Sequence, residues 1–364
     1  MINDFIEYWV ATKLLVSGGN PYSPAELLAA QQALGWRQPE PLMMWNPPWT
    51  LSFTLPFGLF DYQTAQFAWF LSHTLIIFVG AQWLWKMYGG DPRKSRYAVI
   101  CVSSFAPTYF VLLLGQIGPL ILLGLIAFLA SVKKRAWGLA GVSLTIAAIK
   151  PHLLYLVWLA SFMWTVRNAK WKLPVGFMLA GVSVALLPLV FDRQLYLQYS
   201  QLLTTGSIIR PLDWATPSLG TALAELLAIR DVWIRWLPSV GGVIWFLWYW
   251  SKHAATWDWL AELPLVILVS VSTASFVWTF DYVVLLPAAV QAAVWTSRTE
   301  DRVARAVIIG THIGLGGILL ASKVFVLNDF WYFWLAPSLL LFYLAARALL
   351  GSATTFQNHQ TVRE

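Results

Sequence analysis

The residues of this sequence best suited to chemistry stand ahead of its first long apolar run. Asp4, Glu7 and Tyr8 are spaced i, i+3 and i+4, so a helix over 3–16 places all three on one face. Two carboxylates and a phenol in this arrangement can form part of a catalytic site. The alternative is a solvated outer loop in which Asp4 has no catalytic role, and the residue types alone leave both interpretations open.

A lysine and a histidine follow a continuous apolar run in "IAAIKPH" (146–152). Pro151 lacks an amide hydrogen, so it stops the helix behind Lys150. At a membrane boundary, a cation beside an imidazole suits a lipid phosphate, with Lys150 as a point charge and His152 as a hydrogen-bond donor. Interfacial snorkelling of a lysine at a helix end is the alternative.

Polar or aromatic side chains stand at three other chain reversals. Tyr22 closes the helix-breaking segment "SGGNPY", Asn46 opens the rigid turn "NPPW", and Gln116 lies at the tight connection "LLGQIG". A buried amide at Gln116 can bond a sugar hydroxyl, and a helix-capping role fits it as well. The motif "NPPW" by itself indicates only a turn.

Two later segments add charged residues. Arg210 lies in the long loop segment "SIIRPLDWATPSLG", where it can hold a phosphate. Asp281 and Tyr282 occupy a tight turn between two apolar runs. Because an acid beside hydrocarbon needs a partner, we expect Asp281 to pair with Lys150 or Arg210, either in a binding site or as a purely structural ion pair.

The composition indicates that the helices carrying these residues lie in a membrane. Of the 364 residues, 59% are apolar and 11% are charged, whereas soluble domains carry roughly 25% charged residues. The apolar runs are long and continuous, which predicts an all-α polytopic transmembrane bundle. The stretch 47–60 is short and interrupted, so we expect it to be interfacial or re-entrant; a twelfth span is the alternative. We expect about eleven spans, near 63–85, 97–114, 117–132, 136–149, 152–166, 173–190, 234–250, 263–279, 282–297, 305–322 and 330–347.

The charges assign the two sides of this bundle. One set of loops, including 86–96, 133–135 and 297–305, holds 16 of the 24 Lys and Arg residues but only 6 acids, and the positive-inside rule makes this set cytoplasmic. The other set then faces outward and carries the candidate residues. The net charge of +7 lies in short loops and is a topology signal, so we expect membrane lipids as partners and no nucleic acid.

The domain organisation follows from the spans. Residues 1–350 form one transmembrane domain, in which 1–48 is an outer loop with two short juxtamembrane helices, and 351–364 is a disordered cytoplasmic tail. An outward N-terminus without a preceding helix needs a route across the bilayer. We interpret this as a missing leading span, and a native protein with an outward N-terminus is the alternative.

Motifs for ATP, nicotinamide or metal chemistry are absent from the sequence. We therefore expect no metal and no other cofactor. A polytopic transporter or lipid flippase is the rival class, and such proteins often carry inverted repeats and charges at the bilayer midplane. The sequence has no convincing repeat, and its unusual polar residues gather toward one face, which favours chemistry at that face.

Several of these segments occur together in a known family. "DFIEYW", "GGNPY", "NPPW", "LLGQIG", "IKPH" and a late "FDYVVLLP" follow one another in this order and resemble glycosyltransferase family 87 over roughly residues 4–290. The family contains polytopic mannosyltransferases of the GT-C type that use a polyprenyl-phosphate sugar. Its catalytic aspartate normally lies in the first outer loop, directly after the first transmembrane helix.

The resemblance implies a hexosyltransferase of the plasma (inner) membrane whose active site faces the extracytoplasmic side. Asp4 matches the family's aspartate, which makes it the general base of an inverting transfer from a polyprenyl-phosphate sugar to a glycolipid or glycan acceptor. Lys150, His152 and Arg210 would stabilise the donor phosphate. The residues expected to bind the sugar or the acceptor are Glu7, Tyr8, Tyr22, Asn46, Gln116, Asp281 and Tyr282.

Overall fold

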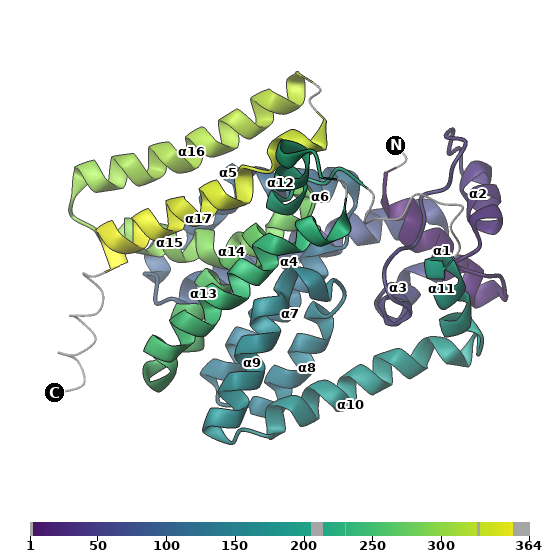
Figure 1. Cartoon of the computed structure of the whole chain (residues 1–364), viewed down its shortest axis with the longest axis horizontal. Coiled ribbons are helices and arrows are strands. Elements are labelled where there is room, and N and C mark those ends of the chain that lie inside the picture. Colours follow the sequence, from purple (N-terminus) through teal and green to yellow (C-terminus); the bar gives the residue numbers. More distant parts are fainter. Residues whose placement is uncertain (1–2, 205–213, 230, 326–327, 352–364) are drawn as a thin grey trace.

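The computed structural model describes residues 3–204, 214–229, 231–325 and 328–351. Helices make up most of this part, and it contains no β-strand (Figure 1). The all-α prediction is therefore confirmed. The predicted tail falls almost wholly outside the described residues.

Five of the described helical segments are long and apolar enough to cross a membrane. The number rises to six if the bent pair α5 (Arg96–Ser104) and α6 (Ala106–Leu114) forms one span. The chain is thus a multi-pass membrane protein. The five segments are α4 (Tyr62–Met87), α10 (Lys172–Leu186) with its extension to Val190, α15 (Leu286–Arg298) with the preceding turn from Thr279, α16 (Arg302–Val324), and α17 (Leu335–Ala346) with flanking turns over Asp329–Gly351.

The expectation of about eleven spans is not confirmed. The predicted runs do coincide with helices, but α8 (Trp137–Ala147) has only 11 residues. At a rise of about 1.5 Å per residue, such a helix is about 16 Å long, roughly half the hydrocarbon thickness. Four further predicted spans match helices that do not reach the length and apolarity of a span: α7 (Gly118–Lys133), α9 (Tyr155–Asn168), α13 (Leu237–His253) and α14 (Trp259–Thr273).

The predicted span 97–114 is broken rather than straight. α5 and α6 meet at an angle of 62° around Phe105. Pro107, in the first turn of α6, has no amide hydrogen to donate to the carbonyl of Ser103, as a continuous helix would require. That carbonyl instead accepts the hydroxyl of Tyr109. The carbonyl of Ser103 therefore keeps a hydrogen-bond partner at the bend.

The two short helices expected within 1–48 are present as α1 (Phe5–Ser17) and α2 (Pro24–Ala33). Gly18 ends α1 in the left-handed conformation, with φ 81°, and the Ser23 hydroxyl caps α2 by accepting the amide of Glu26. The stretch 47–60 contains the eight-residue helix α3 (Leu51–Gly58), which is too short to cross. These elements lie together at the right of Figure 1, near α11 (Leu195–Thr204), whereas α12 (Leu219–Leu227) lies closer to the centre.

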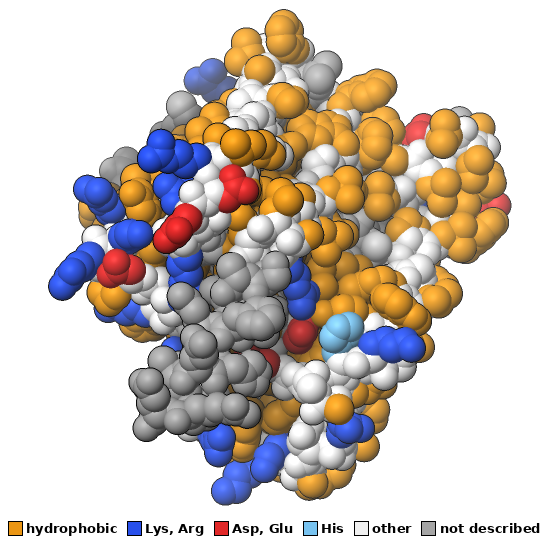
Figure 2. All heavy atoms as spheres, turned by 90° about the vertical axis from the view of Figure 1, so that its left-hand side faces the viewer, with side chains coloured by type: hydrophobic (Ala, Val, Ile, Leu, Met, Phe, Trp, Pro, Cys, Tyr) orange, Lys and Arg blue, Asp and Glu red, His pale blue; other side chains and the backbone are white. Residues whose placement is uncertain are grey.

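Three loops of the basic set lie close to one another in the structure. Lys94 Nζ donates to the carbonyl of Ser297 at 3.2 Å, and Lys133 Nζ to that of Met87 at 3.3 Å, so three basic loops lie together. Figure 2 views the molecule from the left-hand side of Figure 1, where α15 ends and α16 begins, and Lys and Arg side chains lie around its margin. We call this the basic end, and the opposite end, which carries Asp4, the Asp4 end.

Helices α8 and α10 approach each other backbone to backbone. A Cβ atom added at Gly176 would lie 2.1 Å from the carbonyl oxygen of Gly138, and one added at Gly141 would lie 2.0 Å from that of Leu173. Such close approach through small residues is a common way to pack membrane helices. The approach therefore depends on glycine at these positions.

Gly176→Ala should lower the melting temperature of the detergent-purified protein, because overpacking at a rigid backbone contact costs about 1–3 kcal/mol. Gly181→Ala lies on the same helix with no atom within 4 Å of the added Cβ, so it is the matched control and should melt like the wild type. Equal melting temperatures for the two variants would contradict this packing.

Candidate active site

The N-terminal helix is tied to the turn between α6 and α7. The amide of Asp4 donates to the carbonyl of Leu114 at 2.9 Å, and Asp4 Oδ2 accepts a hydrogen bond from Gln116 Nε2 at 2.9 Å. The hydroxyl of Tyr8 donates to Gln116 Oε1 at 2.8 Å. The Gln116 side chain therefore connects Asp4, which precedes α1, to Tyr8 on α1, with its nitrogen hydrogen-bonded to one and its oxygen to the other.

Three residues that the sequence analysis missed hold this turn in place. Asn3 Nδ2 donates to the carbonyl of Leu113 at 3.1 Å, while Asn3 Oδ1 accepts a hydrogen bond from Gln66 at 3.0 Å. Trp69 Nε1 donates to the carbonyl of Gly115 at 2.8 Å. Gln66 and Trp69 are three positions apart on α4, and their helical spacing within an apolar run was the available signal.

A buried ion pair forms the second part of the site. Lys150 Nζ lies 2.7 Å from Asp281 Oδ1, and the two residues are 9% and 0% exposed. Asp281 Oδ2 also accepts the amide of Trp278 at 2.9 Å, and the ammonium lies 5.0 Å from the ring centroid of Phe280. Lys150 is one of the two partners that the sequence suggests for Asp281.

The local backbone explains why Lys150 can reach this position. α8 ends at Ala147, and Lys150 adopts φ −126° and ψ 77°, away from the helical region, as expected for a residue before proline. The short 3₁₀ helix η3 (Pro151–Leu154) then leads into α9. Asp281 lies in a second 3₁₀ helix, η8 (Thr279–Leu285), which precedes α15.

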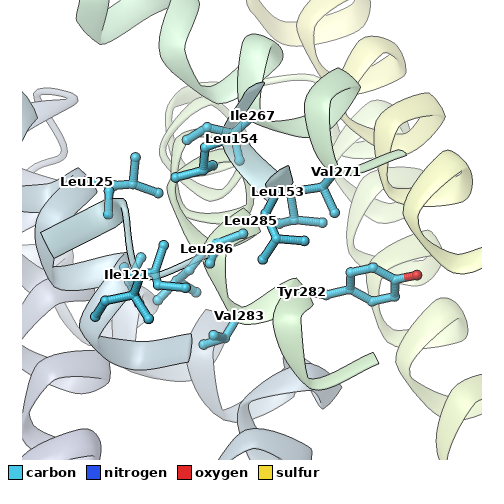
Figure 3. Close-up of a cluster of buried hydrophobic side chains, with 14 of the residues drawn as sticks. Ile121, Leu125, Leu153, Leu154, Ile267, Val271, Tyr282, Val283, Leu285 and Leu286 are labelled. Atoms are coloured by element: carbon cyan, nitrogen blue, oxygen red, sulfur yellow. The ribbon is translucent and has the colours of Figure 1, made fainter. Parts of the chain in front are cut away.

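An apolar core lies between these two 3₁₀ helices and fixes their relative position (Figure 3). Side chains of α7, η3, α14, η8 and the first residue of α15 meet there, and the labelled ones are all buried. Because interiors pack densely, this core restricts movement of the two chain segments that carry the ion pair. The labelled members are Ile121, Leu125, Leu153, Leu154, Ile267, Val271, Tyr282, Val283, Leu285 and Leu286.

The two parts of the site lie within electrostatic reach of each other. Burial raises the pKa of Asp4, while the hydrogen bond from Gln116 and the positive charge of Lys150 lower it. Burial and the nearby Asp4 raise the pKa of Glu7 well above its usual value, and Lys150 again acts in the opposite direction. The structure thus brings together Asp4, Glu7, Tyr8, Gln116, Lys150 and Asp281.

Tyr22 and Asn46, by contrast, contact each other rather than this group. The Tyr22 hydroxyl donates to the carbonyl of Asn46 at 3.4 Å, and its ring centroid lies 5.1 Å from that of Tyr199. This contact joins the N-terminal segment to α11.

The three remaining candidates are Tyr282, His152 and Arg210. Tyr282 is fully buried and donates to the carbonyl of Pro217 at 3.1 Å. The ring of His152 packs edge-on against Phe276 at 5.6 Å, and its buried Nε2 has no hydrogen-bond partner in the part of the chain that the structure describes. Arg210 lies outside the described residues.

This arrangement supports two kinds of chemistry. Asp4 Oδ1 has no hydrogen-bond partner within the described ranges, so it is free to accept a proton from a hydroxyl. The Lys150 ammonium supplies positive charge for an anion. The described ranges contain no group of three or more His, Cys, Asp or Glu side chains that could hold a metal ion.

Fold and site together define a polytopic membrane protein with a buried acid and a buried cation at one end. The model of glycosyltransferase family 87 matches residues 45–273, more than half of the chain, so the chain belongs to this family. It is therefore a membrane glycosyltransferase, which acts on a sugar donor and an acceptor, and the resemblance seen in the motifs is confirmed. No significant match was found among the curated proteins or the solved structures. Gln116 and Lys150 lie within the matched range, whereas Asp4 lies ahead of it.

Lys150→Met should strongly destabilise the protein, because it leaves Asp281 charged and unpaired in the interior, a change that typically costs about 3–5 kcal/mol. Adding Asp281→Asn removes that charge and keeps an acceptor for the Trp278 amide, so the double variant should recover most of the lost stability. Thermal unfolding in detergent measures both variants. A double variant less stable than Lys150→Met alone would contradict a direct pair.

Proposed function

We propose that this enzyme moves a hexose, mannose by the family resemblance, from a polyprenyl-phosphate sugar to a hydroxyl of an extracytoplasmic glycolipid or glycan. The observation that carries the proposal is the Asp4 carboxylate, held by Gln116 and within the field of the Lys150 ammonium. The carboxylate offers a base for the acceptor hydroxyl, and the ammonium offers positive charge for the donor phosphate.

In this mechanism Asp4 takes the proton of the acceptor hydroxyl while the hydroxyl oxygen attacks the anomeric carbon. The bond from that carbon to the phosphate oxygen breaks, and its electron pair leaves with the lipid phosphate. Attack from the face opposite the phosphate inverts the anomeric configuration. The Gln116 amide holds Oδ2 of the carboxylate, so Oδ1 is the atom that receives the proton.

We assign the donor phosphate to Lys150, His152 and Arg210. The Lys150 ammonium has three N–H donors and gives one to Asp281, so donors remain for a phosphate oxygen. The unpartnered Nε2 of His152 supports a further hydrogen bond. The assignment of Arg210 rests on the sequence alone.

Sugar and acceptor contacts are assigned to residues around the two clusters. Glu7, Tyr8 and Gln116 belong to the group that surrounds Asp4, so they are the best placed of this set. The remaining assignments rest on the sequence resemblance: Tyr22 and Asn46, which contact each other, and Asp281 and Tyr282, which are fully buried.

We further propose that residues 1–350 are one GT-C-like domain in the plasma membrane. The basic end is then cytoplasmic by the positive-inside rule, and the Asp4 end is extracytoplasmic. A donor lipid can lie among the helices while its head group reaches the Asp4 end. This orientation gives the enzyme access to acceptors outside the cytoplasm.

Asp4→Asn should reduce transfer from a labelled polyprenyl-phosphate mannose by roughly 10²–10⁴-fold, the usual contribution of a general base. The amide is isosteric, so the melting temperature should stay close to that of the wild type. Asp61→Asn is the matched control, because Asp61 is an exposed acid that caps α4. Full activity in Asp4→Asn would exclude the base assignment.

The transfer rate should fall as the pH drops through the pKa of Asp4, because the base works only when ionised. Burial raises this pKa above 3.8, and the Gln116 hydrogen bond lowers it. Gln116→Met removes that bond, so it should move the acid limb of kcat/KM to higher pH. Gln63→Met, at an exposed position of α4, is the control. An unshifted limb in Gln116→Met would contradict the role of the amide.

A further inference from the structure

A second acid lies one helical turn after Asp4 and has no partner of its own. Glu7 is 9% exposed, and its carboxyl group makes no hydrogen bond or ion pair with any residue that the structure describes. Asp4, by comparison, accepts a hydrogen bond from Gln116 at 2.9 Å. Two carboxyl groups of one site therefore have different surroundings, which is the usual way in which a protein separates their protonation states.

The nearby cation is already committed to another acid. Lys150 Nζ lies 2.7 Å from Asp281 Oδ1, so Glu7 does not share a direct ion pair with it. An ionised carboxylate without a partner is costly to bury, and the charge of Asp4 adds repulsion. Both effects raise the pKa of Glu7 well above its usual value, whereas the positive charge of Lys150 lowers it.

The other elements packed against α1 supply no further counter-charge. α3 contains no titratable side chain, and the Glu26 carboxylate of α2 accepts the amide of Asn20 instead. On α1 itself, Lys13 points toward α3, where it donates to the carbonyl of Gly58 at 3.4 Å. From α4, Tyr62 stacks on Phe5, and it is neutral at physiological pH.

The remaining titratable groups that act on this site are Asp281, Tyr8 and Asp329, and the Asp329 carboxylate forms an ion pair with Lys323. If Glu7 were ionised, Asp4, Glu7, Asp281 and Lys150 would sum to two negative charges before the phosphate arrived. With Glu7 neutral the sum is one negative charge, so an anionic donor meets less repulsion.

We propose that Glu7 is held as a neutral carboxylic acid and donates a hydrogen bond to an anionic phosphate oxygen of the lipid-linked sugar. The inference rests on the proposed function and moves Glu7 from the sugar and acceptor contacts assigned above to the donor phosphate. Asp4 is then the ionised base of the pair, and Glu7 is a donor-binding group. An amide at position 7 can make the same hydrogen bond without carrying a titratable proton.

The test compares Glu7→Gln with Glu7→Ala, using polyprenyl-phosphate mannose as the donor across pH 5 to 9.5. At neutral pH, Glu7→Gln should stay within about threefold of the wild-type kcat/KM, because its amide still donates. Glu7→Ala should lose about tenfold or more, mainly through a raised donor KM. The wild-type rate should decline at alkaline pH as Glu7 ionises, and Glu7→Gln should lack this decline.

Two results would overturn the assignment: a Glu7→Gln variant as impaired as Glu7→Ala, or an alkaline decline that persists in Glu7→Gln. If Glu7→Ala fails to fold, the pH profiles of Glu7→Gln and the wild type still decide the question. A wild-type enzyme that transfers no sugar from this donor would overturn the proposed function and the role of Glu7 with it. An active wild type with an inactive Glu7→Gln would overturn the role of Glu7 alone.

Discussion

One buried ammonium group organises the charges at the Asp4 end of the bundle. The charge of Lys150 acts on Asp4 and Glu7, and its ammonium forms a direct ion pair with Asp281. Since a buried charge is costly unless it is paired or hydrogen-bonded, a single cation cannot stabilise three ionised acids equally. The acids divide accordingly: Asp281 has the ion pair and a backbone amide, Asp4 has the amide of Gln116, and Glu7 has neither. Chemically distinct carboxyl groups thus arise from the partners that each one has.

The same end depends on interruptions of regular helix. Gly115 ends α6, Pro151 prevents α8 from continuing, and Trp278 precedes η8. Backbone groups freed by such breaks must be satisfied within the protein at membrane depth. Here Trp69 donates to the carbonyl of Gly115, and the amide of Trp278 donates to Asp281. The buried carboxylate of Asp281 therefore both pairs with Lys150 and satisfies a backbone amide at a helix break.

Sequence patterns predicted the positions of most helices, whereas the contacts between distant residues became known only from the structure. Apolar periodicity and caps located the helices, including α1 and α2, because those signals are local. Helix length was less predictable. Apolar character indicates that a segment is buried or in lipid, but it does not show where the helix ends. The short α8 was therefore predicted as a span. The partner of Asp281 remained ambiguous, since residues 131 positions apart meet only through tertiary packing. Asn3 was missed because an asparagine ahead of a helix usually indicates a helix cap. Its hydrogen bond to Leu113, at the distant end of α6, forms only in the folded protein.

The central claim is that Asp4 and Lys150 act on one donor molecule. The most direct measurement is an experimental structure of the protein in lipid nanodiscs with a non-transferable polyprenyl-phosphonate analogue of the mannose donor. The account predicts a phosphonate beside the Lys150 ammonium, with the sugar between it and the Asp4 carboxylate, on the side opposite the basic end. A head group bound at the basic end, or one that contacts neither side chain, would contradict it.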